Sequence, residues 1–244
     1  MNDNNGAVEV AEGVYWIGFF DDESQLNSNP YLIIDGDEAV LIDPGSIPDF
    51  PVIMRKVVEL INPESISTLV AAHQDPDVCG NLPVIEDVVN RDDLKIVAHS
   101  TTQKLIYHYG VKSELYAVDE HGYQLTLKSG RELQFIFTPY LHSPGAIATY
   151  DPKTKILFSS DIFGSLSKSK ELFAGDSFPQ SMDQWHEIIM PSNALLQNAL
   201  STFEKMDIDM ILPQHGSLIP KERVAEAITH LKALPCGYDL MAKG

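Results

Sequence analysis

Four short apolar runs in this 244-residue chain each end in a loop that carries histidine or aspartate, and this repetition constrains the fold most. The first loop, residues 73–77, reads His-Gln-Asp-Pro-Asp and directly follows the apolar run 66–72. That run is typical of a buried strand, and residues 80–90 have the pattern of a helix. A strand-to-helix loop can direct one imidazole and two carboxylates into a single cleft. The segment therefore predicts a metal site.

Three later loops repeat this arrangement. His142, Asp161 and His215 each follow a short apolar run and shortly precede a glycine. Strands that end side by side bring such loops to one edge of a sheet, where the sites of layered α/β folds gather. A single residue of this kind is more often a hydrogen-bonded structural residue. Four such loops in one chain favour a shared metal centre.

The order of these motifs resembles the metallo-β-lactamase superfamily, and within it the diiron domain of flavodiiron proteins. The matching stretches are His-x-Asp-x-Asp at 73–77, Pro-x-Leu-His-x-Pro at 139–144, Phe-Ser-x-Asp-x-Phe-Gly at 158–164 and Pro-x-His-Gly at 213–216. The opening at 13–18, 29–34 and 39–45 also resembles the N-terminal hairpins of that family. The resemblance implies an α/β (α+β) fold, the four-layer αββα metallo-β-lactamase sandwich, with residues 1–244 as a single diiron domain.

The resemblance also implies six metal ligands, carried over residue by residue: His73, Asp75 and His142 at one metal, Asp77 and His215 at the other, and Asp161 as the bridge. Many zinc hydrolases of the superfamily have histidine where this chain has Asp75 and Val78. Three imidazoles and three carboxylates form an oxygen-rich set, which suits two iron ions or manganese. Zinc is also expected in recombinant protein, because the Irving–Williams order favours it over ferrous iron.

Several neighbours of the ligands are expected to shape the site. Val78 leaves the second metal without one imidazole, and an open position is where a small ligand binds. Cys79 is interpreted as a residue of the ligand pocket or of redox chemistry, although free cysteine is commonly a small buried apolar group. Tyr140 either reaches a bound ligand or packs in the core. The segment 173–185 suggests a lid, and His186 next to it is the further histidine of most interest.

Composition excludes several partners. The net charge is −18, from 35 acidic and 17 basic residues, so nucleic acid and anionic membranes are not expected to bind. No apolar run approaches the roughly 18 to 20 residues that span a bilayer, and the polar start is not a signal peptide. The two cysteines form no C-x-x-C pair, which is typical of a reducing compartment. We therefore expect a cytoplasmic protein, and we also expect a homodimer.

Three functions fit these residues. Only a short tail follows His215, which suggests that no flavodoxin domain is attached, and the chain then resembles stand-alone oxygen-binding diiron proteins. That resemblance implies a sensor that binds dioxygen, as a peroxo adduct, or another diatomic ligand, and signals to a chemotaxis or redox-response protein. The second function is an oxygen or nitric oxide reductase with a separate electron donor. The third, a zinc metallohydrolase, rests on the superfamily alone. Whether the protein is an enzyme stays open at this point.

Overall fold

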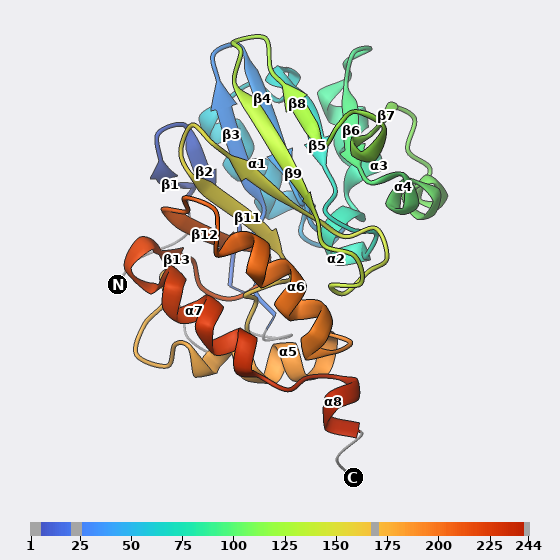
Figure 1. Ribbon diagram of the computed structural model, residues 1–244. Helices are drawn as coiled ribbons and strands as arrows, with labels where there is room; N and C mark the ends of the chain where they lie inside the picture. The colour runs from blue at the N-terminus through green and yellow to red at the C-terminus, as the bar shows by residue number, and fades with distance from the viewer. Residues whose placement is uncertain (1–5, 21–25, 167–170, 242–244) are drawn as a thin grey trace. The chain divides into compact units, whose positions relative to one another are not determined.

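The computed structural model describes residues 6–20, 26–166 and 171–241 (Figure 1). The chain forms two compact units, each with strands and helices. Unit 1 comprises residues 1–19 and 28–135, and unit 2 comprises residues 20–27 and 136–244. The protein is thus a mixed α/β protein whose strands form two sheets.

Unit 1 is built on a seven-stranded sheet whose strands lie in sequence order. They are β1 (Val8–Ala11), β2 (Val14–Trp16), β3 (Tyr31–Asp35), β4 (Glu38–Ile42), β5 (Ile66–Val70), β6 (Lys95–Ala98) and β7 (Glu114–Ala117). The pairs from β1 to β4 are antiparallel, and those from β4 to β7 are parallel. The Asp-Gly pair predicts the β3–β4 turn correctly, with Gly36 at φ 65°.

The apolar residues near the N-terminus favour one continuous strand over residues 7–19, but the structure divides this segment into β1 and β2. Gly13 makes the turn between them, with φ 69°. A Cβ atom at this position would lie 2.7 Å from the carbonyl oxygen of Ile34, so both the conformation and the space require glycine. The alternation of the sequence did not reveal this turn.

The helices of unit 1 bury their apolar faces on the sheet. They are α1 (Phe50–Leu60), α2 (Pro76–Cys79), α3 (Leu82–Val89) and α4 (Ser100–Ile106), with 3-10 turns η1 (Pro63–Ser65), η2 (Tyr107–Tyr109) and η3 (Val118–Glu120). Ile53 and Val57 of α1 and Ile85 of α3 join Leu41 and Leu69 of the sheet in one buried cluster. Full burial of such side chains contributes about 1.5–3 kcal/mol each, so this contact stabilises the layer that carries residues 73–79.

Unit 2 has strands β10 (Ile147–Asp151), β11 (Ile156–Ser160), β12 (Met210–Pro213) and β13 (Ile219–Pro220). Its helices are α5 (Asp183–Ile189), α6 (Asn193–Phe203), α7 (Lys221–Ala233) and α8 (Tyr238–Met241), with the 3-10 turn η4 (Gln180–Met182). Helices α6 and α7 lie side by side and share a buried cluster with the strands (Figure 1). Among the described residues, no helix is long and apolar enough to cross a membrane.

Buried charged side chains connect the β3–β4 hairpin to a second hairpin. The second hairpin consists of β8 (Gln124–Thr126) and β9 (Glu132–Phe137), which pair antiparallel. Arg131 is almost fully buried, and its Nη1 lies 3.6 Å from Oδ1 of Asp35 at the β3–β4 turn. The Ser129 hydroxyl donates to the same carboxylate, and the Lys128 N–H donates to Glu38 at 2.6 Å.

We expect Arg131→Met to lower the free energy of unfolding by roughly 3 kcal/mol, because it leaves the buried Asp35 carboxylate without its guanidinium. Adding Asp35→Asn should recover part of this loss, since the uncompensated charge is then absent. Urea unfolding of the two variants and the wild type measures both effects. Equal midpoints for Arg131→Met and wild type would contradict the assignment.

Candidate metal centre

Three of the predicted ligands belong to unit 2, and strand register brings them to one edge of its sheet. β11 and β12 are parallel neighbours, so Asp161 and His215, which follow them, leave the sheet at the same edge. β10 runs antiparallel to β11, and therefore the loop that precedes β10 reaches this edge as well. That loop contains His142.

The three side chains converge on the carboxylate of Asp161. His142 Nε2 lies 3.1 Å from Asp161 Oδ2, and His215 Nε2 lies 3.6 Å from Asp161 Oδ1. The side chains of Asp161 and His215 are 3% and 2% exposed, and that of His142 is 21% exposed. One carboxylate with an imidazole nitrogen against each oxygen can serve as a ligand shared by two metal ions.

A backbone hydrogen bond fixes the tautomer of His215. Its Nδ1 lies 2.7 Å from the carbonyl oxygen of Asn27, which can only accept. Nδ1 therefore carries the proton, and in the neutral ring Nε2 is the nitrogen that can bind a metal. Histidines that bind metals are commonly held in this way, by a carbonyl on the other ring nitrogen.

The glycines that follow the ligands are required by close packing. A Cβ atom on Gly164 would lie 2.7 Å from Trp185 Nε1, and one on Gly216 would lie 1.9 Å from the Ser165 hydroxyl oxygen. Gly216 also has φ +83°. Ser160 and Phe163, on either side of Asp161, have φ 55° and 69°, which costs on the order of 1 kcal/mol or more each for residues with a side chain.

His186 holds this loop from α5 and is not placed as a ligand. It is fully buried; its Nε2 accepts the N–H of Phe163 at 3.0 Å, and its Nδ1 donates to the Met182 carbonyl at 2.8 Å. Trp185 donates its indole N–H to the Asp161 carbonyl at 3.0 Å. Burial lowers the pKa of His186 to about 4, so the ring is neutral at pH 7.

The other three predicted ligands follow β5 in unit 1. His73 is buried, and its Nε2 lies 3.8 Å from Asp75 Oδ2. Asp75 is the N-cap residue of α2, and Asp77 lies in the first turn of that helix. The residue before His73 is fixed by Asp43, whose Oδ1 accepts the N–H of Ala72 at 2.8 Å. These contacts hold the ligand loop against the end of β4.

Val78, Cys79 and Tyr140 differ from one another in their surroundings. The Val78 side chain is fully buried in the apolar cluster of unit 1. Burial raises the pKa of the Cys79 thiol well above its usual range, and its Sγ donates to the Asp75 carbonyl at 3.1 Å, so the thiol supports the ligand loop. Tyr140 is 54% exposed, and the interpretation as a core residue is therefore wrong.

The segment 173–185 is anchored at several points, which argues against a loose lid. Ala174 N–H donates to the Leu218 carbonyl at 2.9 Å. Arg223 of α7 donates to the carbonyls of Gly175 and Phe178 at 2.7 and 2.9 Å, and its guanidinium lies 4.5 Å from the Phe178 ring centroid. Four residues just before this segment, 167–170, lie outside the described residues.

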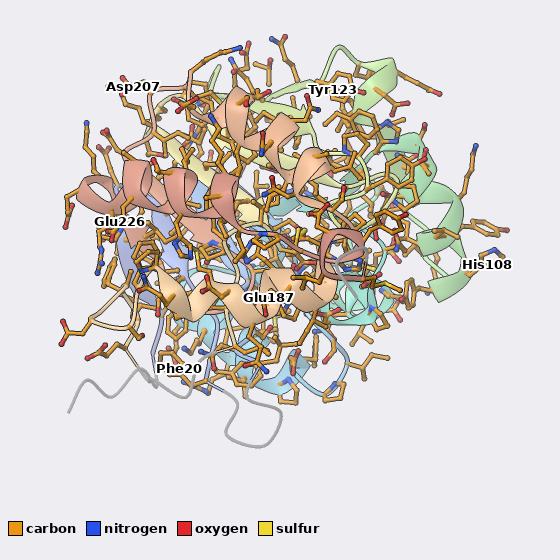
Figure 2. The ribbon with its side chains drawn as sticks, turned by 60° about the horizontal axis from the view of Figure 1, so that its bottom comes forward. Phe20, His108, Tyr123, Glu187, Asp207 and Glu226 are labelled. Atoms are coloured by element: carbon orange, nitrogen blue, oxygen red, sulfur yellow. The ribbon has the colours of Figure 1, made fainter. Side chains whose placement is uncertain are left out.

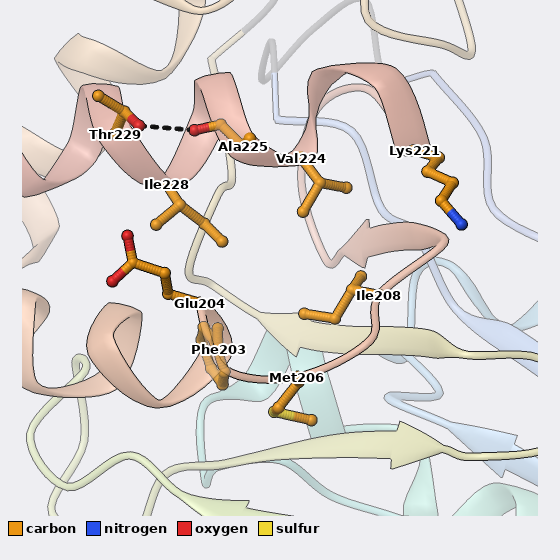
Figure 3. A pocket seen from close by; sticks show the side chains of 9 residues that line it. All are labelled: Phe203, Glu204, Met206, Ile208, Lys221, Val224, Ala225, Ile228 and Thr229. Carbon is orange, nitrogen blue, oxygen red and sulfur yellow. Dashed lines mark hydrogen bonds between the residues drawn. The ribbon is translucent and has the colours of Figure 1, made fainter.

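One of the remaining histidines and a pocket of unit 2 lie outside the ligand loops. His108, in η2, is exposed at the surface (Figure 2). A pocket of about 280 Å³ lies between the end of α6 and α7, with Phe203 and Ile228 among its apolar lining and none of the six predicted ligands (Figure 3). Thr229 at its rim donates to the Ala225 carbonyl at 2.8 Å.

The supporting residues had no signal in the sequence. Asp43, Trp185 and the carbonyl of Asn27 act on ligands that are distant in sequence from them, and no spacing rule connects the two. His186 has one local signal, its place directly after an aromatic-containing stretch. Such contacts depend on tertiary packing and are found from coordinates.

The donor atoms fit a pair of hard or borderline divalent cations. Each unit supplies imidazole together with carboxylate, and in unit 2 both oxygens of Asp161 face imidazole nitrogens. Imidazole suits iron and zinc, and carboxylates suit iron and manganese. No thiolate takes part among these six residues, which disfavours iron–sulfur clusters and sites selective for soft metals.

The fold and these ligand loops define a protein of the metallo-β-lactamase type. A family model described as "ODP family beta lactamase" matches residues 26–216, and the chain belongs to that family. The predicted fold class is confirmed. A structure titled "Peroxy diiron species of chemotaxis sensor ODP" superposes with a TM-score of 0.82 and 25% identity, over 97% of this chain and 98% of that chain.

Two curated relatives are longer than this chain. An uncharacterised protein of Methanocaldococcus jannaschii is 29% identical over 235 residues, which are 91% of this chain and 58% of that protein. A nitric oxide reductase of Moorella thermoacetica is 27% identical over 241 residues, which are 90% of this chain and 60% of that enzyme. The chain thus spans somewhat more than half the length of these relatives.

The neutral state of His186 predicts a pH dependence of stability. Its pKa is about 4 when folded and about 6.5 when unfolded, so below pH 6.5 the unfolded state binds the proton and stability falls until about pH 4. The loss is on the order of 3 kcal/mol. Urea unfolding of metal-free wild type and His186→Gln between pH 7.5 and 4.5 tests this. An equal pH slope in both proteins would contradict it.

Proposed function

We propose that His73, Asp75, Asp77, His142, Asp161 and His215 bind two iron ions, and that this diiron centre binds dioxygen in an oxygen or iron sensor. The six residues are those that the family resemblance assigns, and the donor chemistry of both units supports them. Zinc or manganese is expected to replace iron in some preparations.

One observation carries the proposal. The likeness to the chemotaxis sensor ODP, whose title names a diiron species, extends over nearly the whole of both chains. The longer relatives are matched over little more than half their length, so the nitric oxide reductase among them is a weaker guide. A signalling protein of chemotaxis or redox response is the partner that fits this likeness. A single domain over residues 1–244, a homodimer and a cytoplasmic location belong to the same proposal.

Individual residues of the chain have different roles in such a site. Iron, when bound, supplies electrons that dioxygen can accept. Asp161 spaces two ligand imidazoles, and Asn27 keeps His215 in the tautomer that offers Nε2. His186 and Trp185 hold the loop of Asp161 without offering protons, because His186 is neutral and donates to a carbonyl. Val78 puts an apolar side chain where an imidazole would add a donor and a proton source.

A reductase with a separate electron donor is the second candidate. The match to the nitric oxide reductase of Moorella thermoacetica favours it, because 90% of this chain aligns with that enzyme. The two candidates share the metal ligands and differ in the fate of the oxygen. Measurements of turnover therefore separate them, whereas ligand mutations do not.

Metal analysis tests the ligand set. We expect about two iron ions per chain after anaerobic loading, and a loss of at least one in His142→Ala and in Asp161→Ala, since each removes a ligand. His108→Ala is the matched control, because that side chain is exposed and outside the ligand loops. Full retention of both ions in both variants would exclude these residues as ligands.

Oxygen uptake tests the sensor. Without an added electron donor, the reduced protein should take up about one dioxygen per two iron ions, with an absorbance change that persists and then reverses on evacuation. An oxygen electrode and optical spectra follow both quantities. Continuous consumption of dioxygen or nitric oxide with a reductant would identify the reductase instead. Hydrolysis of lactams, thioesters or phosphoesters by the zinc form would instead favour the third function, a zinc metallohydrolase.

A further inference from the structure

Gln74 stands between two predicted ligands of unit 1 and is held from outside the ligand loop. The phenol of Tyr109, in η2, donates to the Gln74 carbonyl at 3.0 Å. Cys79 Sγ donates to the next carbonyl, that of Asp75, at 3.1 Å. Two successive peptide groups of the loop are therefore fixed by side chains, one of them from a segment 35 residues away.

Gln74 in turn makes the two oxygens of Asp75 different. Its amide Nε2 donates to Asp75 Oδ1 at 2.9 Å. The other oxygen, Oδ2, lies 3.8 Å from Nε2 of His73. The amide thus sets the rotation of the carboxylate, so that Oδ2 is the oxygen that faces the His73 imidazole.

Tyr109 has the chemistry of a hydrogen-bond donor. Burial is the main cause that raises the pKa of its phenol to about 12, so the phenol keeps its proton at neutral pH. Its acceptor is a peptide carbonyl, which cannot take the proton away. The contact with the Gln74 carbonyl therefore acts through geometry.

We propose that Tyr109 and Gln74 are positioning residues that make Asp75 a ligand through Oδ2 alone. Tyr109 fixes the backbone of Gln74, the Gln74 amide retains Oδ1, and Oδ2 remains for the metal that His73 also binds. The inference rests on the proposed ligand set. The inference adds that Asp75 gives this metal one oxygen and not two. The position that the second oxygen could occupy then stays available.

The test compares Tyr109→Phe and Gln74→Leu with wild type and with Tyr116→Phe. The control removes the same kind of bond, since the Tyr116 phenol donates to the Gln124 carbonyl at 2.8 Å in the same unit, far from the ligand loop in sequence. Removing an outer partner of a metal ligand commonly weakens metal binding about 10- to 100-fold. We expect at least about a 10-fold loss for one of the two metals in both variants, measured by chelator competition with Co²⁺.

The Co²⁺ spectrum provides a readout that lost stability alone does not move. The visible bands depend on coordination number, and a second bound oxygen from Asp75 should change their intensity in Gln74→Leu and Tyr109→Phe but not in Tyr116→Phe. If Tyr109→Phe fails to fold, Gln74→Leu alone decides the result. Affinity and spectra equal to those of Tyr116→Phe in the folded variants would overturn the inference. Failure of wild type to bind Co²⁺ or iron would instead overturn the proposed function.

Discussion

The parallel pairing of β11 with β12 is the constraint on which the site in unit 2 depends. Parallel strands end at the same edge, so the residues that follow them meet there however far apart they are in sequence. The antiparallel β10 adds the loop of His142 to the same edge. The Asp161 carboxylate then lies between two imidazoles, and His186 and Trp185 hold its loop.

The loop that carries the Asp161 carboxylate contains locally unfavourable conformations. Ser160 and Phe163 have left-handed backbone angles, and His186 is buried as a neutral ring with both nitrogens hydrogen-bonded. Such conformations persist only where packing over-determines them. The cluster of α6 and α7 with the strands of unit 2 supplies that packing. A site built on this support can hold its ligands in place before a metal arrives, which is the requirement for selective binding.

In unit 1, hydrogen bonds from side chains to the backbone hold the predicted ligand loop in place. Asp43 fixes the peptide before His73, and Tyr109 and Cys79 fix the carbonyls of Gln74 and Asp75. The aromatic and thiol groups near the predicted ligands are thus protonated donors. Their raised pKa values follow mainly from burial.

The sequence by itself determined the fold class, and it predicted the longer strands and helices and the ligand loops. The apolar periodicity, the Asp-Gly pair and the order of the His and Asp motifs are local signals, so they can be read directly from the sequence. It did not reveal the turn at Gly13, the two-residue β13, or α5, because packing against neighbouring segments sets these features. Only the tertiary structure decided that Gly164 and Gly216 leave room for Trp185 and Ser165, and that His186 supports a loop instead of binding metal. Burial and register decide such roles, and both are properties of the packed chain.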